Sequence, residues 1–390
     1  MKAKKSSIYR FHSIALALIF CAAIYAPLFI GILQEGKKVS QTEKRVLAKL
    51  PALPGTMKEI AAYPKALDTF YSDHFGLREV FSNMYFRIHN KIETSSPSSD
   101  VTYGQDGWMF LGSIKKGYTR YNDPMGDVMN INLFTNEELE RFARNMLAIK
   151  DWLSKQGIGY VFVIAPNKHT IYFEKLPKYI KKQNKESATD QIVRYLREHT
   201  DVVVVDLREP LLKEKERRQV YQKTDTHWNH YGANVAQFEI MKEIGRLFPG
   251  RISPQLLKPS EFKITSTGGG DLAVMAMKEG ITEEYPRPSF ENACNPVKDP
   301  PDADEAKDGF SMICNSRGLN VLIFRDSFFD ALQPYFSRKF GRSTYIWDRI
   351  SGSTLMKYVE REKPDLVIEE VVERSFPYIP KGIGQLPSPL

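Results

Sequence analysis

Continuous apolar runs alternate with helical patterning through most of the chain after its first hundred residues. The apolar runs cover residues 160–165, 202–206, 321–324 and 365–372, with a weaker run at 343–347. Runs of this length without polar alternation are typical of strands buried on both faces of a sheet. Helical periodicity covers residues 136–156, 188–198 and 354–361. Strands that alternate with helices predict an α/β fold with a doubly wound, mainly parallel sheet.

A different pattern marks the N-terminus. Residues 11–33 contain no Asp, Glu, Lys or Arg, and they follow a basic cluster of Lys2, Lys4, Lys5 and Arg10. About 20 apolar residues cross a bilayer core, whereas the apolar part of a cleaved signal peptide is usually shorter. We therefore predict that residues 1–35 form a cytoplasmic tip and a transmembrane signal anchor, in preference to a buried helix of a soluble domain. The basic cluster favours a cytoplasmic N-terminus, which predicts a single-pass protein of the inner or cytoplasmic membrane with a periplasmic or otherwise extracytoplasmic main domain.

Turn-rich segments divide the rest of the chain. Residues 36–100 combine a juxtamembrane linker with helical patterning at 63–92, and a Ser/Pro cluster ends this region. Residues 101–112 contain two short apolar runs around an Asp-Gly turn, which predicts a hairpin. We expect the catalytic domain to cover residues 101–378, with a loop insertion at 285–318 and a tail at 379–390.

Two of the three cysteines lie in this insertion. Cys294 and Cys314 bracket a Pro- and Asp-rich segment, and in an oxidising compartment they are a candidate disulfide. Closing a loop of about 20 residues stabilises a fold by roughly 3 kcal/mol in the chain-entropy model. The alternative is a pair of free thiols.

Composition and charge add little to this picture. With 390 residues, 42% of them hydrophobic and 26% charged, the chain is a folded globular protein. The formal net charge of +8 comes partly from the N-terminal basic cluster and partly from runs such as 181–185 and 213–218, which fit solvated helix surfaces. No nucleic-acid motif accompanies the charge, so we expect no nucleic-acid partner, and we expect no cofactor.

Two polar segments follow predicted strands, which is where doubly wound sheets bind ligands. Residues 223–232 read Lys-Thr-Asp-Thr-His-Trp-Asn-His-Tyr-Gly, and residues 324–329 read Phe-Arg-Asp-Ser-Phe-Phe. A serine nucleophile needs an imidazole base, and the base needs a carboxylate that orients it. Asp225 and His227 are two residues apart, so an extended backbone places their side chains on the same side. We therefore predict Ser327, His227 and Asp225 as the catalytic residues.

Other roles are open for the same residues. Ser327 could cap the helix that follows it. Asp225, His227 and His230 could bind a metal ion. No further ligand cluster stands out near them, so we predict no metal and place His230 at the surface or behind the site.

Weaker candidates for substrate or oxyanion contacts surround these segments. Gly270 lies in the Gly-Gly-Gly-Asp segment 268–271 and could offer its amide to an oxyanion, or the segment could be plain connection. Asn167 follows the strand at 160–165 and could line the pocket or cap a turn. Arg374 follows the last strand and could touch substrate, although a surface salt bridge explains it and Glu373 better. The candidates for substrate or oxyanion contacts are Asn167, Gly270, Arg325, Trp228 and Arg374.

Six segments of the chain carry a family resemblance. They are residues 73–78, 107–112, 164–169, 224–229, 270–272 and 325–328. In this order they resemble the AlgJ/AlgX-like family of polysaccharide (alginate-type) O-acetyltransferases, which are SGNH-hydrolase-like proteins. The resemblance implies a triad of Asp225, His227 and Ser327 that transfers acetyl groups to an exported surface polysaccharide through an acetyl-serine. It also implies a partner acyltransferase of the MBOAT type that supplies the acetyl groups.

Two features qualify what the resemblance implies. Arg325 stands where the usual Gly-Asp-Ser block has its glycine, so the oxyanion geometry of that block does not transfer directly. After Ser327 there is no room for the C-terminal carbohydrate-binding module of AlgX-like members, so we expect the AlgJ type. The alternative functions are an SGNH-type polysaccharide acetylesterase, with water as the acceptor, and a non-catalytic polysaccharide-binding scaffold.

Overall fold

The computed structural model describes residues 14–21, 25–26, 30–31, 39–40, 45–77, 84, 100–112, 122–276, 278, 280–290, 294–301, 309–314 and 318–376. The chain divides into two compact units. One comprises residues 1–97 and 274–278, and the other comprises residues 98–273 and 279–390.

The first unit contains one long helix, α2 (Met57–Asp73), and a short antiparallel pair, β1 (Val39–Ser40) and β2 (Arg45–Val46). A capping box starts α2, because Thr56 Oγ1 accepts the Glu59 amide and the Glu59 carboxylate accepts the Thr56 amide. Within the parts of the chain that the structure describes, no helix has the length and apolarity needed to cross a membrane. Much of the expected anchor at 11–33, and most of the expected helical segment beyond residue 77, lie outside the described residues. The anchor therefore stays a prediction.

A seven-stranded mixed sheet forms the centre of the second unit. The strands, in their order across the sheet, are β6 (Val203–Asp206), β5 (Gly159–Ala165), β13 (Leu366–Val372), β11 (Asn320–Phe324), β12 (Arg342–Ile346), β10 (Phe310–Ile313) and β9 (Val297–Asp299). The five strands from β6 to β12 are parallel, as expected from their apolar runs.

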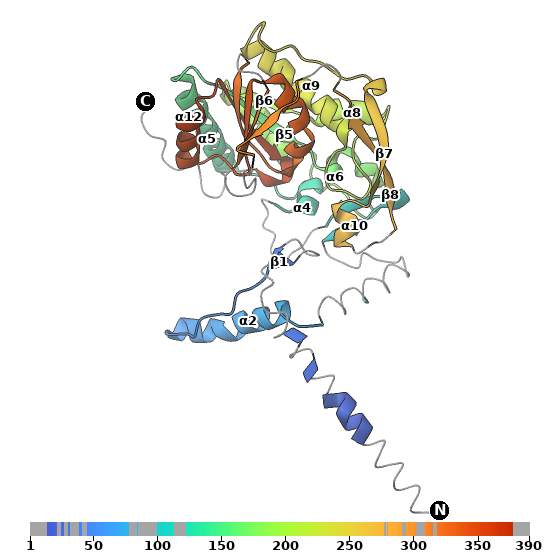
Figure 1. The fold of residues 1–390 in the computed structure, drawn as a ribbon. Coiled ribbons are helices and arrows are strands. Elements are labelled where there is room, and N and C mark those ends of the chain that lie inside the picture. Colours follow the sequence, from blue (N-terminus) through green and yellow to red (C-terminus); the bar gives the residue numbers. More distant parts are fainter. Residues whose placement is uncertain are drawn as a thin grey trace, which may run out of the picture. The chain divides into compact units, whose positions relative to one another are not determined.

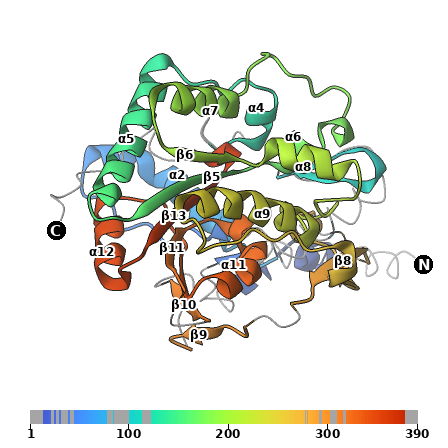
Figure 2. The same cartoon turned by 90° about the horizontal axis from the view of Figure 1, so that it is seen from above.

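The sheet is mainly parallel, as expected, but it is mixed, because β10 and β9 run antiparallel at one edge (Figure 2). Both strands belong to residues 285–318, which we expected to form a loop. Phe310 to Ile313 pair with Tyr345 to Arg342 of β12, and this pairing satisfies backbone groups that an edge strand would otherwise expose.

Helices cover both faces of this sheet. Along β5, Val161 and Val163 pack into one core cluster, whereas Phe162 and Ile164 pack into the other. The helices α5 (Asn136–Ser154), α7 (Ala188–His199) and α12 (Gly352–Glu362) contribute to the second cluster, and α8 (Arg208–Lys215), α9 (His230–Leu247) and α11 (Gln333–Lys339) contribute to the first (Figure 1). Burial on both faces explains the continuous apolar runs of the central strands.

Two hairpins and several short helices complete this unit. The predicted hairpin at 101–112 is confirmed, with β3 (Val101–Tyr103) antiparallel to β4 (Met109–Leu111). The second hairpin, β7 (Phe262–Gly268) and β8 (Thr282–Pro288), was not expected. The short helices are α4 (Pro124–Val128), α6 (Lys168–Ile171) and α10 (Asp271–Met275), and the 3-10 turns are η1 (Gln105–Gly107), η2 (Phe173–Lys175), η3 (Pro259–Glu261), η4 (Ser327–Ala331) and η5 (Glu373–Ser375).

Cys294 and Cys314 are joined as a disulfide, with their Cα atoms 5.9 Å apart, a separation usual for such bonds. The bond ties the segment before β9 to the end of β10.

Candidate active site

The site is built on a loop that leads into α9. The loop is closed at its base by an antiparallel bridge between Tyr221 and Trp228. Asn229 caps α9, because its Oδ1 accepts the amides of Tyr231 (2.9 Å) and Gly232 (3.1 Å). With both of its ends fixed in this way, the loop presents Asp225 and His227 at its tip.

The three predicted catalytic residues lie within hydrogen-bond distance of one another. His227 Nδ1 lies 2.8 Å from Asp225 Oδ1, and His227 Nε2 lies 2.7 Å from Ser327 Oγ. The Asp225 carboxylate also accepts the backbone amide of His227 at 2.9 Å. A carboxylate at Nδ1 favours the tautomer that carries its proton there, which leaves Nε2 able to accept the proton of Ser327.

Ser327 begins the 3-10 turn η4, directly after β11. Sequence alone allowed Ser327 to be the cap of the following helix, but the cap is Asp326, whose Oδ1 accepts the Phe328 amide at 3.0 Å. Asp326 Oδ2 also accepts the amide of Val372 and one nitrogen of Arg349, each at 2.9 Å. The Ser327 hydroxyl is therefore left for His227.

Trp228 connects the two parts of the site. Its indole Nε1 donates to the backbone carbonyl of Phe328 at 2.9 Å, and its ring packs edge-on against the Phe328 ring. Trp228 is buried, and its contacts fix the serine turn against the histidine loop. This position differs from our expectation that Trp228 would contact substrate.

Ionisation equilibria agree with this pairing. Burial raises the pKa of Asp225, but its hydrogen bond to His227 and the charge of the imidazolium outweigh burial and lower the pKa to about 2. Burial lowers the pKa of His227, but the hydrogen bond and charge of Asp225 outweigh it, and the charge of Asp271 adds to them, so the pKa is raised. The protonated histidine is thus stabilised by carboxylates on one side of its ring.

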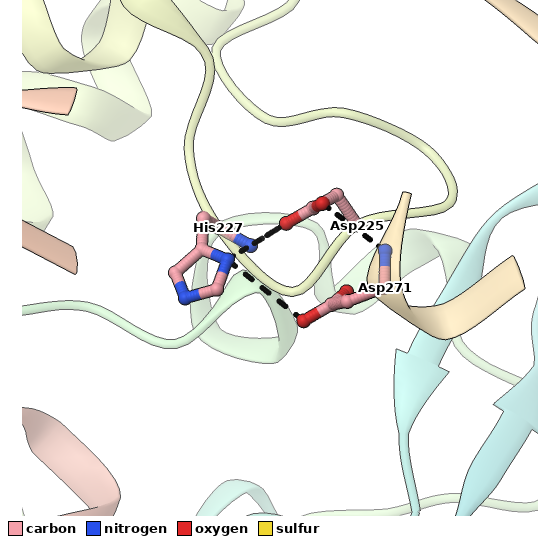
Figure 3. Close-up of side chains that lie close together, drawn as sticks. All are labelled: Asp225, His227 and Asp271. Atoms are coloured by element: carbon pink, nitrogen blue, oxygen red, sulfur yellow. Dashed lines mark hydrogen bonds and ion pairs between the residues drawn. The ribbon is translucent and has the colours of Figure 1, made fainter. Parts of the chain in front are cut away.

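Asp271 is a site residue that the sequence analysis missed. Its Oδ2 lies 3.8 Å from His227 Nδ1 (Figure 3). Its Oδ1 accepts the Thr226 amide at 2.7 Å. Burial first, and then the charge of Asp225, raise the pKa of Asp271. The three consecutive glycines before Asp271 were the available signal, because a run of glycines often marks a close approach between backbone segments.

The residues that could bind a metal ion differ from those we considered, because Asp271 takes the place of His230. Ligand atoms of Asp225, His227 and Asp271 lie within 4.8 Å of one another, and His230 is not among them. His230 lies neither at the surface nor in this cluster, because it is buried in the first turn of α9 with its ring edge-on to Tyr285. Both ring nitrogens of His227 already have partners in Asp225 and Ser327, an arrangement that suits proton transfer.

A buried cation beneath the loop is a second residue that the sequence analysis missed. Lys168 is 2% exposed. Its ammonium donates to the carbonyls of Gln222 (3.2 Å), Lys223 (3.1 Å) and Asp225 (2.5 Å). Burial lowers the pKa of Lys168 to about 7, against the opposing charges of Asp271, Asp225 and Glu283. The Lys168 ammonium thus binds three backbone carbonyls of the loop and links them to α6.

Asn167 and Arg374 meet beyond the ends of β5 and β13. Arg374 Nη1 donates to Asn167 Oδ1, and the Arg374 guanidinium lies 5.6 Å from the centre of the Phe328 ring. Asn167 is buried and uses its Nδ2 on Asp127 at 2.7 Å. The expected surface salt bridge is wrong for Glu373. Glu373 is buried, and its carboxylate accepts the backbone amide of Asn167 at 2.7 Å.

The two remaining candidates have other partners. Arg325 is 3% exposed, pairs with Asp330 and lies over the Trp347 ring at 4.3 Å, so its guanidinium already has an anionic partner. The Gly270 amide, which we considered as a donor to the oxyanion, already donates to Thr224 Oγ1 at 3.0 Å.

Comparison with known proteins gives a family match over the same region. Residues 101–328 match the model of the SGNH hydrolase-like domain of the acetyltransferase AlgX. This stretch is more than half of the chain, and it contains Asp225, His227 and Ser327. The probable alginate O-acetylase AlgJ of Pseudomonas syringae pv. tomato is 25% identical over 198 residues, which are 50% of this chain and 45% of that protein. The probable alginate O-acetylase AlgJ of Pseudomonas fluorescens is 26% identical over 227 residues, which are 58% and 53%.

The chain spans about half the length of these curated relatives. Among solved structures, it is similar to the O-acetyltransferase domain of Pseudomonas putida AlgJ, with a TM-score of 0.43, 20% identity, and coverage of 72% of this chain and 92% of that one. Bacillus cereus PatB1 gives a TM-score of 0.48 and 16% identity, with 70% and 95% covered.

Proposed function

This chain belongs to the AlgJ/AlgX-like family of SGNH hydrolase-like acetyltransferases, and from this premise we propose that it transfers acetyl groups to hydroxyls of an exported cell-surface polysaccharide. The observation that carries the proposal is the unbroken chain of contacts from Asp225 through His227 to Ser327, with distances of 2.8 and 2.7 Å. This geometry places a base and an orienting carboxylate behind a serine nucleophile.

In the first half of the reaction, His227 Nε2 removes the proton of Ser327 as its oxygen attacks the carbonyl carbon of an acetyl donor. The C–O bond to Ser327 forms, and the tetrahedral intermediate collapses with loss of the donor's leaving group. His227 returns its proton to that group. Asp225 stabilises the imidazolium between these two steps.

In the second half, His227 removes the proton of a sugar hydroxyl, which attacks the acetyl-serine. The new ester forms on the sugar, and the proton on His227 returns to the Ser327 oxygen. The two half-reactions make the mechanism ping-pong, because the donor's leaving group departs before the sugar is acetylated.

The Ser327 amide is the best-placed donor for the developing oxyanion. The Phe328 amide donates to the Asp326 side chain, and the Phe329 amide donates to the Asp326 carbonyl. As the first residue of η4, Ser327 has no acceptor for its amide within the turn. A peptide N–H aimed at the oxyanion typically contributes about 10²- to 10³-fold to such a reaction.

Two wider proposals accompany this chemistry. The basic cluster and apolar run at 11–33 support a single-pass membrane anchor with the catalytic domain outside the cytoplasm. The family resemblance supports a partner acyltransferase of the MBOAT type as the source of acetyl groups. Crosslinking of the full chain in its own membrane tests the partner, which should be recovered with it. A membrane-impermeant label tests the anchor, because it should react with the catalytic domain from outside the cytoplasm.

The test of the central proposal is acetyl transfer by the purified full chain in detergent, with an activated acetyl ester as donor and an acidic oligosaccharide as acceptor. We expect acetylated sugar from the wild type and none from Ser327→Ala. Ser353→Ala is the control, because Ser353 is an exposed serine in α12.

The products separate the competing functions. Free acetate with no acetylated sugar would favour an esterase. Failure of a serine-directed sulfonyl fluoride to label Ser327 would favour a scaffold. Unchanged sugar acetylation by Ser327→Ala would refute the mechanism.

A further inference from the structure

The histidine loop is held against the turn at residues 270–273 by hydrogen bonds that run in both directions. The amides of Leu272 and Ala273 donate to the Thr224 carbonyl at 3.1 and 3.2 Å. The Asp271 amide donates to Asp225 Oδ2 at 3.2 Å, and Asp271 Oδ1 accepts the Thr226 amide at 2.7 Å. Asp271 therefore holds the loop at two points: its side chain accepts from the loop backbone, and its amide donates to the Asp225 carboxylate.

The second oxygen of Asp271 faces the histidine. Asp271 Oδ2 lies 3.8 Å from His227 Nδ1, on the same side of the ring as Asp225 Oδ1 at 2.8 Å. Figure 3 shows the two carboxylates converging on that nitrogen. Beyond hydrogen-bond distance, the Asp271 oxygen acts through its charge rather than by accepting the Nδ1 proton.

We propose that Asp271 is a positioning residue of the reaction, which fixes the loop that carries Asp225 and shares with Asp225 the stabilisation of the His227 imidazolium. This inference rests on the proposed function and deepens it. The imidazolium forms twice in each cycle, once when Ser327 is deprotonated and once when the sugar hydroxyl is deprotonated. A second negative charge near Nδ1 favours both of these states.

The direction of the effect follows from the charges around the ring. Asp225 and Asp271 favour the protonated histidine, whereas Arg374 opposes it. Asp271 itself faces Asp225, His227 and the buried ammonium of Lys168. Where Asp271 is ionised, its replacement by a neutral side chain removes a negative charge near the ring and lowers the pKa of His227, so the acidic limb of kcat/KM moves to lower pH. An opposite charge at this range shifts a pKa by about 1 to 3 units, and partial exposure of Asp271 places the shift near the lower end.

Asp271→Asn is the test variant, because it removes the charge and keeps both an oxygen for the Thr226 amide and the backbone amide for Asp225. We expect the acidic limb of kcat/KM to move down by about one pH unit and the plateau to fall several-fold, since a less basic imidazole is a weaker general base. Glu283→Gln is the matched control. Glu283 holds the same loop by accepting the Lys223 and Thr224 amides, but it is not among the leading charges that shift the pKa of His227.

The control separates charge from loop anchoring. Glu283→Gln is expected to lower the plateau without moving the limb. An unmoved limb in a folded Asp271→Asn variant would overturn the proposal, whatever happens to the plateau. Asp271→Glu keeps the charge, so its limb should stay near the wild-type position, and a limb displaced as far as that of the Asn variant would also refute the idea.

A measurement that needs no turnover distinguishes this inference from the proposed function. In the Ser327→Ala background, NMR follows the titration of the His227 ring, identified by its absence in His227→Ala. The midpoint should fall by about one unit when Asp271→Asn is added. A shifted midpoint, together with a wild-type enzyme that transfers no acetyl groups, would uphold the effect of Asp271 on His227 and refute the proposed function. An unshifted midpoint in an active enzyme would refute the role of Asp271 alone.

Discussion

Replacement of Gly270 by alanine would test how closely the loop and the turn must approach. A methyl group at this position would lie 2.6 Å from Asp225 Oδ2 and 2.7 Å from Asp225 Cα. The second distance is about 0.7 Å shorter than the lower end of ordinary contact, 3.4 Å. The clash involves the backbone of Asp225, so rotation of its side chain alone cannot relieve it.

A displacement of this size is large compared with the tolerance of the site. The hydrogen bond between Asp225 Oδ1 and His227 Nδ1 is 2.8 Å long, and a shift of 0.7 Å along it would take it beyond ordinary hydrogen-bond length. Misplacement of a catalytic group by about 1 Å can reduce turnover by about 10²-fold. Overpacking of this kind also destabilises a fold by about 1–3 kcal/mol.

We therefore expect Gly270→Ala to reduce kcat by about 10²-fold, measured by release of acetate or acetylated sugar from an activated ester. Gly268→Ala is the matched control, because a methyl group at Gly268 would meet no atom within 4 Å. It should keep wild-type turnover and melting temperature. Wild-type turnover in both variants would refute the reasoning, since it would mean that the turn can retreat without moving Asp225.

Three further predictions concern stability. Trp228→Phe removes the indole N–H that donates to the buried carbonyl of Phe328. Urea unfolding should show a loss of about 1–3 kcal/mol, together with slower labelling of Ser327. Because the pKa of Asp225 is about 2 in the folded state, below its ordinary value, the carboxylate stabilises the fold above about pH 4, and this contribution disappears as the pH falls through about 2. The stability difference between wild type and Asp225→Asn should therefore shrink between pH 5 and pH 2 in urea titrations, and a constant difference would contradict the pairing. The double variant Cys294→Ser, Cys314→Ser should lose roughly 3 kcal/mol in the same measurement, because the bond closes a 20-residue separation.

The central strands could be predicted from the sequence because burial on both faces leaves an unbroken apolar run. β5, β11 and β13 all lie where such runs occur. By contrast, β7 and β8 form a hairpin in which many residues are exposed and polar, among them Lys263, Glu284 and Arg287. Strands of this kind are defined by pairing with each other, and composition gives little sign of it.

The same contrast holds in the candidate site. Ser327, His227 and Asp225 could be placed together because strand ends and a two-residue spacing constrain them locally. Asp271 and Lys168 contact Asp225 from 46 and 57 residues away along the chain. A buried lysine and an aspartate after glycines have many ordinary roles, so the glycine run indicates a close approach of backbone segments without identifying His227 as the neighbour.

One consequence concerns when activity can arise during folding. His227 and its hydrogen-bond partner Ser327 are 100 residues apart, and β9 and β10 lie between them in the chain. A chain that has emerged only as far as α9 contains the base and its carboxylate but no nucleophile. Non-local contacts of this kind form late, because loop closure must precede them. Under the proposed mechanism, acetyl transfer therefore reports completed folding, and two separately expressed fragments divided after α9 should become active only when they associate.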